Sequence, residues 1–325
     1  MKKNIAIIMG GYSSEVEISL KSGAVVYQHL SKEKYNTYKV HILKNKWVLV
    51  DDNNQEYPIN KHDFSAEIKD EKITFDCVFN AIHGNPGENG TILAYLELLE
   101  IKHTSAPFYQ MALTFNKRDC LSVVKPYGIK TATSYYLDKG DEIKVDAIVK
   151  KVGLPCFVKP NNAGSSFGIS KVKTKEEMIP AIEKAYKEDA QILIEAFLDG
   201  SEITIGVLNY NNEIKVLPMT EIVTKNDFFD YEAKYLGKSE EITPARISDE
   251  IHKKLEKTAI KVYRSLNMSG FTRSEFIIVN GEPHFLEMNT VPGLTAESII
   301  PQQAAEAKIS LQQLFDNAIE MALKN

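Results

Sequence analysis

The segment FVKPNNAGSSFGISKV, residues 157–172, decides how the rest of the sequence is interpreted. A strand-like run ends at Lys159, small polar residues and glycines follow, and a second strand-like run begins after Gly168. Asn, Gly and Ser form turns for purely local reasons, so one interpretation is a simple turn. The segment is not a P-loop, because it lacks the Gly-Lys-Ser/Thr ending and no helix follows it. The other interpretation is a hairpin cap whose N–H groups and serine hydroxyls cover a phosphate, with Lys159 supplying a positive charge.

Length, charge and cysteine content limit the class of protein. The 325 residues exceed one ordinary core, so we expect two or three domains. A net charge of −5 and a pI near 5.9 argue against nucleic acid or an anionic membrane as the main partner. No stretch approaches the length of a membrane span. Cys77, Cys120 and Cys156 are far apart and odd in number, which fits a reducing cytoplasm better than a disulfide framework.

The N-terminal part alternates between strand and helix patterns. An apolar run at 4–11 ends in Gly10-Gly11, apolar residues then recur at helical spacing as far as residue 30, and further strand, strand and helix patterns follow. This alternation predicts an α/β domain with a mostly parallel, doubly wound sheet. The Gly-x-Gly-x-x-Gly fingerprint of dinucleotide-binding folds is absent after the first strand. The periodic pattern breaks at 103–117, where we place a domain boundary.

After that boundary the chain predicts a small unit around the glycine-rich segment and then a strand-rich unit. Helix patterns and strand patterns alternate up to the strand QILIEAFL, and strand patterns dominate from residue 200 onward. The dipeptide Asn280-Gly281 between two strand-like runs is a strong hairpin signal. We therefore expect three domains, at residues 1–116, 117–199 and 200–325.

Three oxygen-bearing side chains on the predicted hairpin indicate a metal site. Glu287 and Asn289 project to the same face of one strand, and Glu275 lies on its partner. Hard carboxylate and amide oxygens suit Mg²⁺. A solvated strand face is the plainer interpretation, but Glu287 follows an apolar run and precedes a Thr-Val-Pro-Gly turn, an odd place for a solubilising charge. Together with a phosphate-covering loop, the site predicts nucleotide-dependent phosphoryl transfer.

The two carboxylates also constrain the register of the hairpin. With a two-residue turn at 280–281, Glu275 and Glu287 would lie on opposite faces, because a one-residue slip turns every side chain over. A shared metal site therefore requires an odd number of turn residues. We predict a three-residue turn at 279–281, with a left-handed glycine in a bulge and Arg273 opposite Glu287.

Seven motifs follow one another along nearly the whole chain. They are MGGYSSEVEIS, AIHGNPGENG, VKPNNAGSSFGISKV, ILIEAFLDGSEITI, DYEAKY, TRSEF and FLEMNTVPGLT. In this order they resemble the signatures of the D-alanine–D-alanine ligase family of the ATP-grasp superfamily. The resemblance implies an ATP-grasp fold that is α+β in its ATP-binding half. It also implies that ATP converts one D-alanine to an acyl phosphate, which a second D-alanine attacks, for peptidoglycan synthesis.

The resemblance further implies the substrate contacts. They fall on Glu15, His83, Ser165, Tyr235, Arg273, Gly293, Ser298 and Ile299. Glu15 would hold the ammonium of the first alanine, although an acid at a helix start is also favoured by the helix dipole. Arg273 and the Gly293 N–H would form an oxyanion hole. Ser298 would contact the carboxylate of the second alanine, although a serine at a helix N-terminus is commonly only a cap.

The nucleotide contacts are implied in the same way. They fall on Lys117, Lys159, Ser166, Glu195, Ala196, Phe197, Leu198, Glu202, Phe228 and Lys234. Lys117 and Lys159 would reach the phosphates, the segment 195–198 would bind adenine, and Glu202 would bind the ribose. Glu275, Glu287 and Asn289 would hold two Mg²⁺ ions, replaceable by Mn²⁺. A cytoplasmic homodimer is also implied.

Several departures and rivals remain open at this level. Glu275 stands where many members have Asp, and Ala163 and Glu297 also differ from some relatives. A ligase making D-alanyl-D-lactate or D-alanyl-D-serine is the nearest rival, and a non-catalytic dinucleotide-binding module is a rival of another class. The neutral hydroxyl of Tyr235 favours D-alanine over D-lactate as acceptor, because extra positive charge would attract the lactate anion and repel an ammonium.

Overall fold

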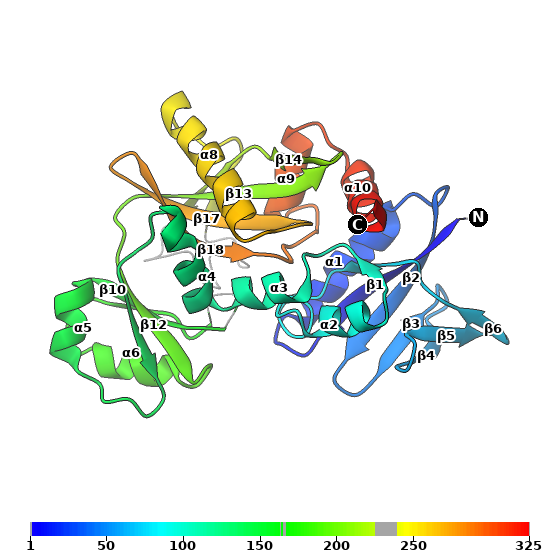
Figure 1. Cartoon of the computed structure of the whole chain (residues 1–325), viewed down its shortest axis with the longest axis horizontal. Coiled ribbons are helices and arrows are strands. Elements are labelled where there is room, and N and C mark those ends of the chain that lie inside the picture. The colour runs from blue at the N-terminus through cyan, green and yellow to red at the C-terminus, as the bar shows by residue number, and fades with distance from the viewer. Residues whose placement is uncertain (1, 163, 165–166, 225–238, 325) are drawn as a thin grey trace.

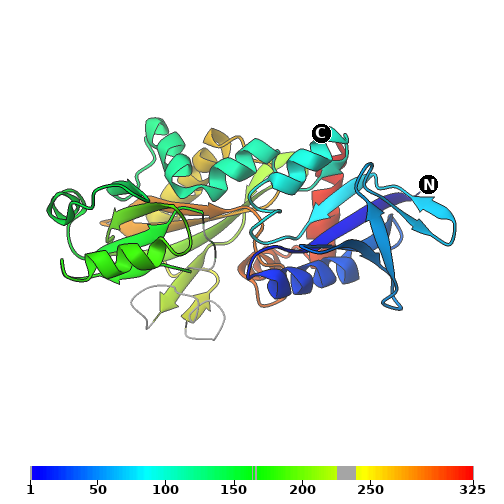
Figure 2. The same ribbon diagram turned by 90° about the horizontal axis from the view of Figure 1, so that it is seen from below.

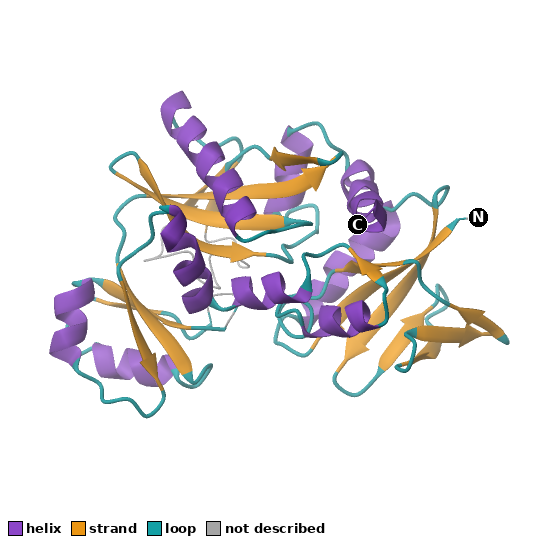
Figure 3. Cartoon of the chain, viewed as in Figure 1, coloured by secondary structure: helices purple, strands orange, loops and turns teal. Residues whose placement is uncertain are grey.

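The computed structural model describes residues 2–162, 164, 167–224 and 239–324, and their strands form three sheets (Figure 3). The first sheet has the strand order β6-β5-β4-β3-β2-β1-β7-β8. Its strands are β1 (Lys3–Gly11), β2 (Tyr35–Leu43), β3 (Trp47–Val50), β4 (Glu56–Asn60), β5 (Ser65–Ile68), β6 (Glu71–Ile73), β7 (Cys77–Asn80) and β8 (Lys102–His103). The strands β2, β1, β7 and β8 are parallel, as the alternating pattern predicts, whereas β3 to β6 continue the sheet as antiparallel hairpins that the sequence analysis did not predict.

Helices cover both faces of the parallel part of this sheet. They are α1 (Val16–His29) and α10 (Leu311–Lys324) on one face, and α2 (Thr91–Leu98) and α3 (Phe108–Phe115) on the other. Because both faces are covered, β1 is an unbroken buried apolar run from Ile5 to Met9. Helix α10 comes from the C-terminal end of the chain, and its Phe315 ring packs edge-on against Phe79 of β7, with 5.7 Å between centroids. Figures 1 and 2 show this red helix beside the blue N-terminal part.

The second sheet is small and antiparallel, with the order β11-β10-β12-β9. Its strands are β9 (Ser134–Asp138), β10 (Cys156–Pro160), β11 (Ser170–Val172) and β12 (Gln191–Ala196), and its helices are α5 (Val145–Val152) and α6 (Met178–Ala185). Apolar residues of both helices and all four strands form a separate core. The glycine-rich segment joins β10 to its antiparallel partner β11, so a strand does follow it.

The third sheet follows the path β16-β15-β13-β17-β18, with β14 beside β13. Its strands are β13 (Ser201–Tyr210), β14 (Glu213–Val216), β15 (Thr220–Thr224), β16 (Ser239–Ile242), β17 (Thr272–Val279) and β18 (Glu282–Asn289). The accompanying helices are α4 (Lys117–Val124), with the 3-10 turn η1 (Lys125–Tyr127), α8 (Asp249–Ser265) and α9 (Ile299–Glu306). The Ser248 hydroxyl caps α8 by accepting the N–H of Ile251.

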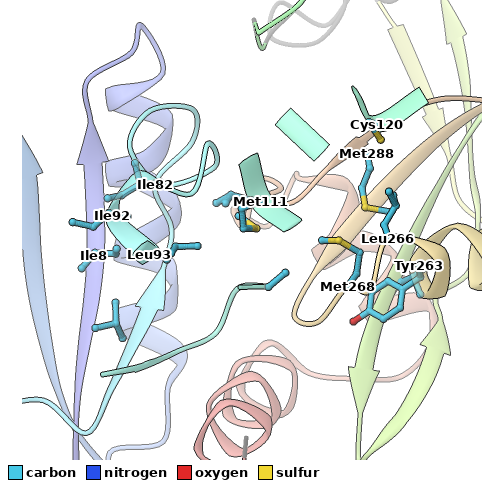
Figure 4. Close-up of a cluster of buried hydrophobic side chains, with 14 of the residues drawn as sticks. Ile8, Ile82, Ile92, Leu93, Met111, Cys120, Tyr263, Leu266, Met268 and Met288 are labelled. Atoms are coloured by element: carbon cyan, nitrogen blue, oxygen red, sulfur yellow. The ribbon is translucent and has the colours of Figure 1, made fainter. Parts of the chain in front are cut away.

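The three sheets are not three isolated bodies. An apolar cluster between the first sheet and α2, which includes Ile8, Ile82, Ile92 and Leu93, continues through Met111 of α3 into the core beside the third sheet (Figure 4). There Cys120 of α4 belongs to the same cluster as Met288 of β18. Helix α4 thus packs on the third sheet, although residues 117–199 form the second. Helix α10 packs on the first sheet, although residues 200–325 form the third. The boundaries at 116/117 and 199/200 stay a prediction.

The register of the β17–β18 hairpin differs from the prediction. Val279 pairs with Glu282, so the turn is the two-residue Asn280-Gly281, and the three-residue turn is wrong. Both turn residues have positive φ, 50° and 75°, which matches the type I′ turn that Asn-Gly favours.

A bulge within the strands supplies the odd residue instead. Phe276 pairs with Phe285 but Glu275 pairs with Glu287, so one extra residue of β18 lies between these two pairs. The bulge turns the end of β18 over, and Glu275 and Glu287 come to lie opposite each other on one face. Arg273 is consequently opposite Asn289, not opposite Glu287 as predicted.

No helix in the described part of the chain is both long enough and apolar enough to cross a membrane. The three cysteines are buried and carry free thiols. Burial raises the pKa of the thiols of Cys77 and Cys120 to about 12 and that of Cys156 to about 11. They are therefore packing residues, because reactive thiols need a lowered pKa and access to solvent.

Packing of α10 on the first sheet can be tested with Phe315→Ala. This side chain is fully buried, so its loss leaves a cavity, and we expect the free energy of unfolding to fall by about 3–5 kcal/mol. Urea denaturation followed by circular dichroism gives the value. Leu98→Ala is the control, because Leu98 is 85% exposed, and it should change stability by less than about 0.5 kcal/mol. Equal effects of the two substitutions would contradict the packing of α10 on the first sheet.

Candidate active site

A cleft of about 390 Å³ lies where the three sheets meet. Its lining comes from the start of α1, the loop after β7, the end of α3, the start of α4 and the glycine-rich loop. The remainder comes from β16, β17, β18 and the segment after β18 up to the start of α9. The predicted site residues that line it are Glu15, His83, Lys117, Arg273, Glu287, Asn289, Gly293, Ser298 and Ile299. Residues from distant parts of the sequence are thus brought to one place.

Glu15 lies at the junction between the first and second sheets. It directly precedes α1, but its side chain makes no capping hydrogen bond, so a helix cap does not explain it. A Cβ added to Gly164 of the glycine-rich loop would lie 3.0 Å from Glu15 Oε2, and one added to Gly84 would lie 3.1 Å from the same oxygen. The two glycines therefore let both loops approach the carboxylate closely.

His83 connects α1 to the segment after β18. The imidazole is buried, its Nε2 lies 3.1 Å from Ser22 Oγ, and it hydrogen-bonds the backbone of Val291. Ser22 Oγ in turn accepts the N–H of Leu294 at 3.2 Å. Burial lowers the pKa of His83, and the nearby Glu15 opposes this shift without cancelling it. The ring is therefore neutral at physiological pH.

Two ion pairs compensate the carboxylates of the hairpin. Lys117 Nζ lies 3.1 Å from Glu287 Oε2, and Arg273 Nη2 lies 2.8 Å from Glu275 Oε1. Glu275 and Glu287 are direct cross-strand partners, and like charges in that position repel. One compensating cation comes from β17 itself and the other from α4, which approaches across the cleft.

Lys159 and Glu195 form a second, deeper charge pair. Lys159 Nζ lies 2.8 Å from Glu195 Oε2, and both side chains are largely buried. Burial lowers the pKa of Lys159, but Glu195, Glu287 and Glu275 together outweigh it and raise that pKa. The lysine is therefore charged, and the field of the hairpin carboxylates reaches it. Glu195 Oε1 has no hydrogen-bond partner among the described residues.

The predicted adenine segment follows β12. The N–H of Ala196 donates to Thr133 O at 2.9 Å, and the N–H of Phe197 donates to Pro155 O at 3.2 Å. Within the described ranges, the N–H of Leu198 has no such partner. Glu202, the predicted ribose contact, lies nearby on β13. The segment thus offers one backbone donor at the edge of the second sheet.

The chemistry of the hairpin fits a hard divalent cation. Glu275 and Glu287 face each other, Asn289 lies on the same face, and all three offer oxygen donors. The Asn289 side-chain oxygen accepts the N–H of Val291 at 3.0 Å, which fixes its orientation. The described residues contain no group of three or more His, Cys, Asp or Glu side chains that could hold a metal, so this donor set is two carboxylates and one amide. Such a set suits Mg²⁺ rather than a softer metal.

Gly293 and Ser298 form the far end of the cleft. A Cβ on Gly293 would lie 2.6 Å from Ser298 Oγ, so a larger residue at this position would displace the Ser298 hydroxyl. Ser298 precedes α9, but its hydroxyl makes no capping bond and instead lies 2.9 Å from Thr295 Oγ1. A helix cap therefore does not explain Ser298 either.

Five predicted site residues lie outside the described residues. They are Ser165, Ser166, Phe228, Lys234 and Tyr235. Ala163, one of the noted departures, lies outside them as well. The roles assigned to these positions stay predictions.

The cleft also contains acids that the sequence analysis did not assign to the site. Glu88, in the loop after β7, is only 9% exposed, and its carboxylate accepts the N–H of Gly84 at 3.2 Å and the N–H of Thr290 at 3.3 Å. Burial and then the charge of Glu15 raise the pKa of Glu88 to about 7. Glu241 of β16 lines the cleft too, and burial raises its pKa although Arg273 opposes the shift. The only sequence signal for Glu88 was its place in the AIHGNPGENG motif.

Comparison with known proteins identifies the family. The family model described as "D-ala D-ala ligase N-terminus" matches residues 4–106, and the one described as "D-ala D-ala ligase C-terminus" matches residues 123–320. The chain belongs to the D-alanine–D-alanine ligase family. It is 68% identical over 321 residues to a D-alanine–D-alanine ligase of Flavobacterium johnsoniae and 59% identical over 323 residues to one of Christiangramia forsetii. Each alignment covers 99% of both chains.

Solved structures of the same family have the same fold. The VanG D-Ala:D-Ser ligase of Enterococcus faecalis is 30% identical with a TM-score of 0.87, and the alignment covers 99% of this chain and 100% of that one. A D-alanine–D-alanine ligase of Bacillus anthracis, solved in complex with ATP, is 28% identical with a TM-score of 0.80, covering 99% and 98% of the two chains. The predicted α/β ATP-grasp class is thereby confirmed.

The raised pKa of Glu88 makes stability depend on pH. The folded state binds this proton more tightly than the unfolded chain, whose carboxyl has a pKa near 4.5. The contribution is therefore fully present below pH 4.5 and is lost as pH rises toward 7. We expect the free energy of unfolding of the wild type, relative to Glu88→Gln, to fall by about 3 kcal/mol across this range.

Urea titrations at several pH values measure this difference. Glu256→Gln, which removes an exposed carboxyl of α8, is the control and should give no such slope. A difference between wild type and Glu88→Gln that stays constant from pH 4.5 to 7 would contradict the assigned pKa shift.

Proposed function

We propose that this protein joins two D-alanine molecules to D-alanyl-D-alanine, with ATP converted to ADP and phosphate, in the synthesis of peptidoglycan precursors. The observation that carries the proposal is the cleft itself, in which Glu15 and His83 face the oxygen donors and cations of the third sheet. The 68% identity to a ligase of this name supports it. The three free, buried cysteines fit a cytoplasmic enzyme.

The first alanine would bind on the side of the first sheet. The Glu15 carboxylate offers a charged partner for its ammonium, and the neutral imidazole of His83 lies beside that position without adding a repelling charge. The substrate carboxylate would then point toward the third sheet. This orientation would direct one of its oxygens to the γ-phosphorus of ATP.

ATP would lie between the second and third sheets. Lys117 and Lys159 are both placed near the hairpin carboxylates, where they would contact phosphate oxygens. The N–H of Leu198 and the Oε1 atom of Glu195 would bind adenine, and the Glu202 carboxylate would bind the ribose. The Bacillus anthracis relative was solved in complex with ATP, which supports ATP as the nucleotide.

Glu275, Glu287 and Asn289 would hold Mg²⁺ between the phosphates and the third sheet. When bound, the metal would neutralise charge on the transferred phosphoryl group. Lys117 and Arg273 already hold compensating charge at these carboxylates. The two hairpin carboxylates are therefore suited to bind cations on the side that faces the cleft.

The reaction would proceed in two steps. A carboxylate oxygen of the first alanine attacks the γ-phosphorus, and ADP leaves, which gives an acyl phosphate. The amine of the second alanine, having lost a proton, attacks the carbonyl carbon, and phosphate leaves from the tetrahedral intermediate. Arg273 and the Gly293 N–H would stabilise the negative oxygen of that intermediate. Ser298 would bind the carboxylate of the second alanine.

The division into three domains at 1–116, 117–199 and 200–325 is part of the proposal, and each range contains one of the sheets. A homodimer is proposed on the resemblance alone. Sedimentation of the purified chain would test it.

The metal assignment can be tested with Glu287→Gln. The amide is nearly the same size but carries no charge, so we expect phosphate release from ATP and D-alanine to fall by at least 10³-fold, about 4 kcal/mol of activation free energy. Glu282→Gln is the matched control, because Glu282 begins the same strand but pairs with Lys130 and Lys254 away from the cleft. Its turnover should stay near that of the wild type. Near-normal turnover of Glu287→Gln at saturating Mg²⁺ would refute the metal role.

The acceptor distinguishes this function from its nearest rivals. The VanG relative is a D-Ala:D-Ser ligase, which makes D-serine the second candidate, and D-lactate is the third. Glu297 adds an acidic side chain to the lining of the cleft, which disfavours the lactate anion relative to a zwitterion. The high identity to D-alanine–D-alanine ligases favours D-alanine over D-serine.

Competition between the three acceptors near pH 7.5, with D-alanine and ATP present, should yield mainly D-alanyl-D-alanine. Its rate should fall as pH drops from about 9 to 6, because less of the attacking amine is unprotonated. Chromatographic separation of the products gives both quantities. A product dominated by D-alanyl-D-lactate or D-alanyl-D-serine would overturn the acceptor assignment.

A further inference from the structure

The loop between β7 and α2 holds Glu88 in a fixed position. Gly84 has a φ of +65°, and a Cβ on Gly87 would lie 2.3 Å from Ile82 O, so the backbone folds back tightly at both glycines. The N–H of Glu88 closes the turn by donating to Gly84 O at 2.6 Å. The carboxyl group consequently points into the molecule and reaches the wall of the cleft.

The two carboxylate oxygens of Glu88 bind two different parts of the active site. Oε2 accepts the N–H of Gly84, next to His83, at 3.2 Å. Oε1 accepts the N–H of Thr290, 202 residues further along the chain, at 3.3 Å. Thr290 directly follows Asn289, at the end of the strand that carries the metal-binding set.

We propose that Glu88 is a positioning residue, whose carboxylate sets the spacing between the loop of the first-alanine subsite and the metal-binding end of β18. This role rests on the function proposed above. The loop side includes Gly84, against which the Glu15 carboxylate lies. The strand side carries Glu287 and Asn289.

This spacing matters because the first step joins groups held on the two sides. The ammonium of the first alanine is held on the loop side and the γ-phosphoryl group on the strand side, and the attacking oxygen has to lie about 3–3.5 Å from phosphorus, in line with the leaving group. A misplacement of about 1 Å costs about 100-fold in rate. A direct hydrogen-bonded bridge between the two sides keeps that distance constant.

The chemistry of the side chain supports a functional role over a packing role. A carboxyl group buried beside a second acid, Glu15, is unfavourable, and an apolar residue at this buried position would avoid that cost. Both bonds use backbone N–H groups, so they fix main-chain positions rather than flexible side chains. A link of this kind transmits position from one segment to the other.

The test compares the steady-state kinetics of Glu88→Gln with those of the wild type. The amide has one accepting oxygen, so its NH₂ group would face one of the two N–H donors and break the bridge on that side. We expect kcat for dipeptide formation to fall about 100-fold. The KM for ATP, and the binding of Mg·ATP measured by calorimetry, should stay within about two-fold, because the nucleotide contacts are untouched.

Asp316→Asn is the matched control. Asp316 is also a buried carboxylate that joins distant segments, since it accepts the N–H of Ser31 at 3.1 Å and pairs with Lys34 at 3.2 Å, but it lies on α10 away from the cleft. Its substitution should lower the melting temperature and leave kcat unchanged. A merely structural role of Glu88 would give the same pattern in Glu88→Gln.

Glu88→Asp provides a second variant should the amide not fold. It keeps both oxygens but draws them back by one methylene, so we expect a folded protein with kcat lowered at least ten-fold and an unchanged KM for ATP. A kcat within two-fold of the wild type in either folded variant, or an equal loss in Asp316→Asn, would overturn the proposal. Dipeptide formation by the wild type is measured first, because its absence would refute the proposed function, whereas a normal wild type with an unimpaired variant refutes only the role of Glu88.

Discussion

The repulsion between Glu275 and Glu287 is the constraint on which the active site depends. Two carboxylates placed opposite each other on neighbouring strands are unfavourable unless positive charge lies close by. Arg273 supplies part of that charge from β17, Lys117 supplies part from α4, and the charged Lys159 also lies within the field of both carboxylates. Helix α4, which carries Lys117, packs on the third sheet through the apolar cluster that joins Cys120 to Met288 of β18. Apolar packing thus holds α4 in place and brings Lys117 to the hairpin carboxylates.

Much of the site was predictable from residue types and order, but its geometry was not. The counting argument correctly required an odd residue between Glu275 and Glu287, yet placed it in the turn, whereas the structure has a bulge in β18. Counting residues shows that an odd number must separate the two facing positions, but it does not show where the extra residue lies. The Asn-Gly dipeptide on its own favours a two-residue turn, which leaves the extra residue to a bulge in the strand. Glu88 escaped prediction for a related reason. Its importance comes from a bond to a residue 202 positions away, and no local pattern reports such a contact.

The fold, too, was predictable in some parts and not in others. Helix and strand periods predicted the parallel half of the first sheet, because buried strands and amphipathic helices leave strong signals. The strands β3 to β6 have only three to five residues and expose many of them, so their pattern is weak. The cover that α10 gives to the first sheet could not be read from the sequence, since an apolar helical face does not say which of three sheets it contacts.

The return of α10 to the first sheet determines the order in which the protein is completed during synthesis. The N-terminal domain leaves the ribosome first, yet the apolar face that carries Phe79 stays uncovered until residues 311–324 have also emerged. The nascent chain therefore carries an exposed aromatic surface while the two later sheets are translated and folded. Covering this surface requires residues 311–324, which follow the strands of all three sheets along the chain.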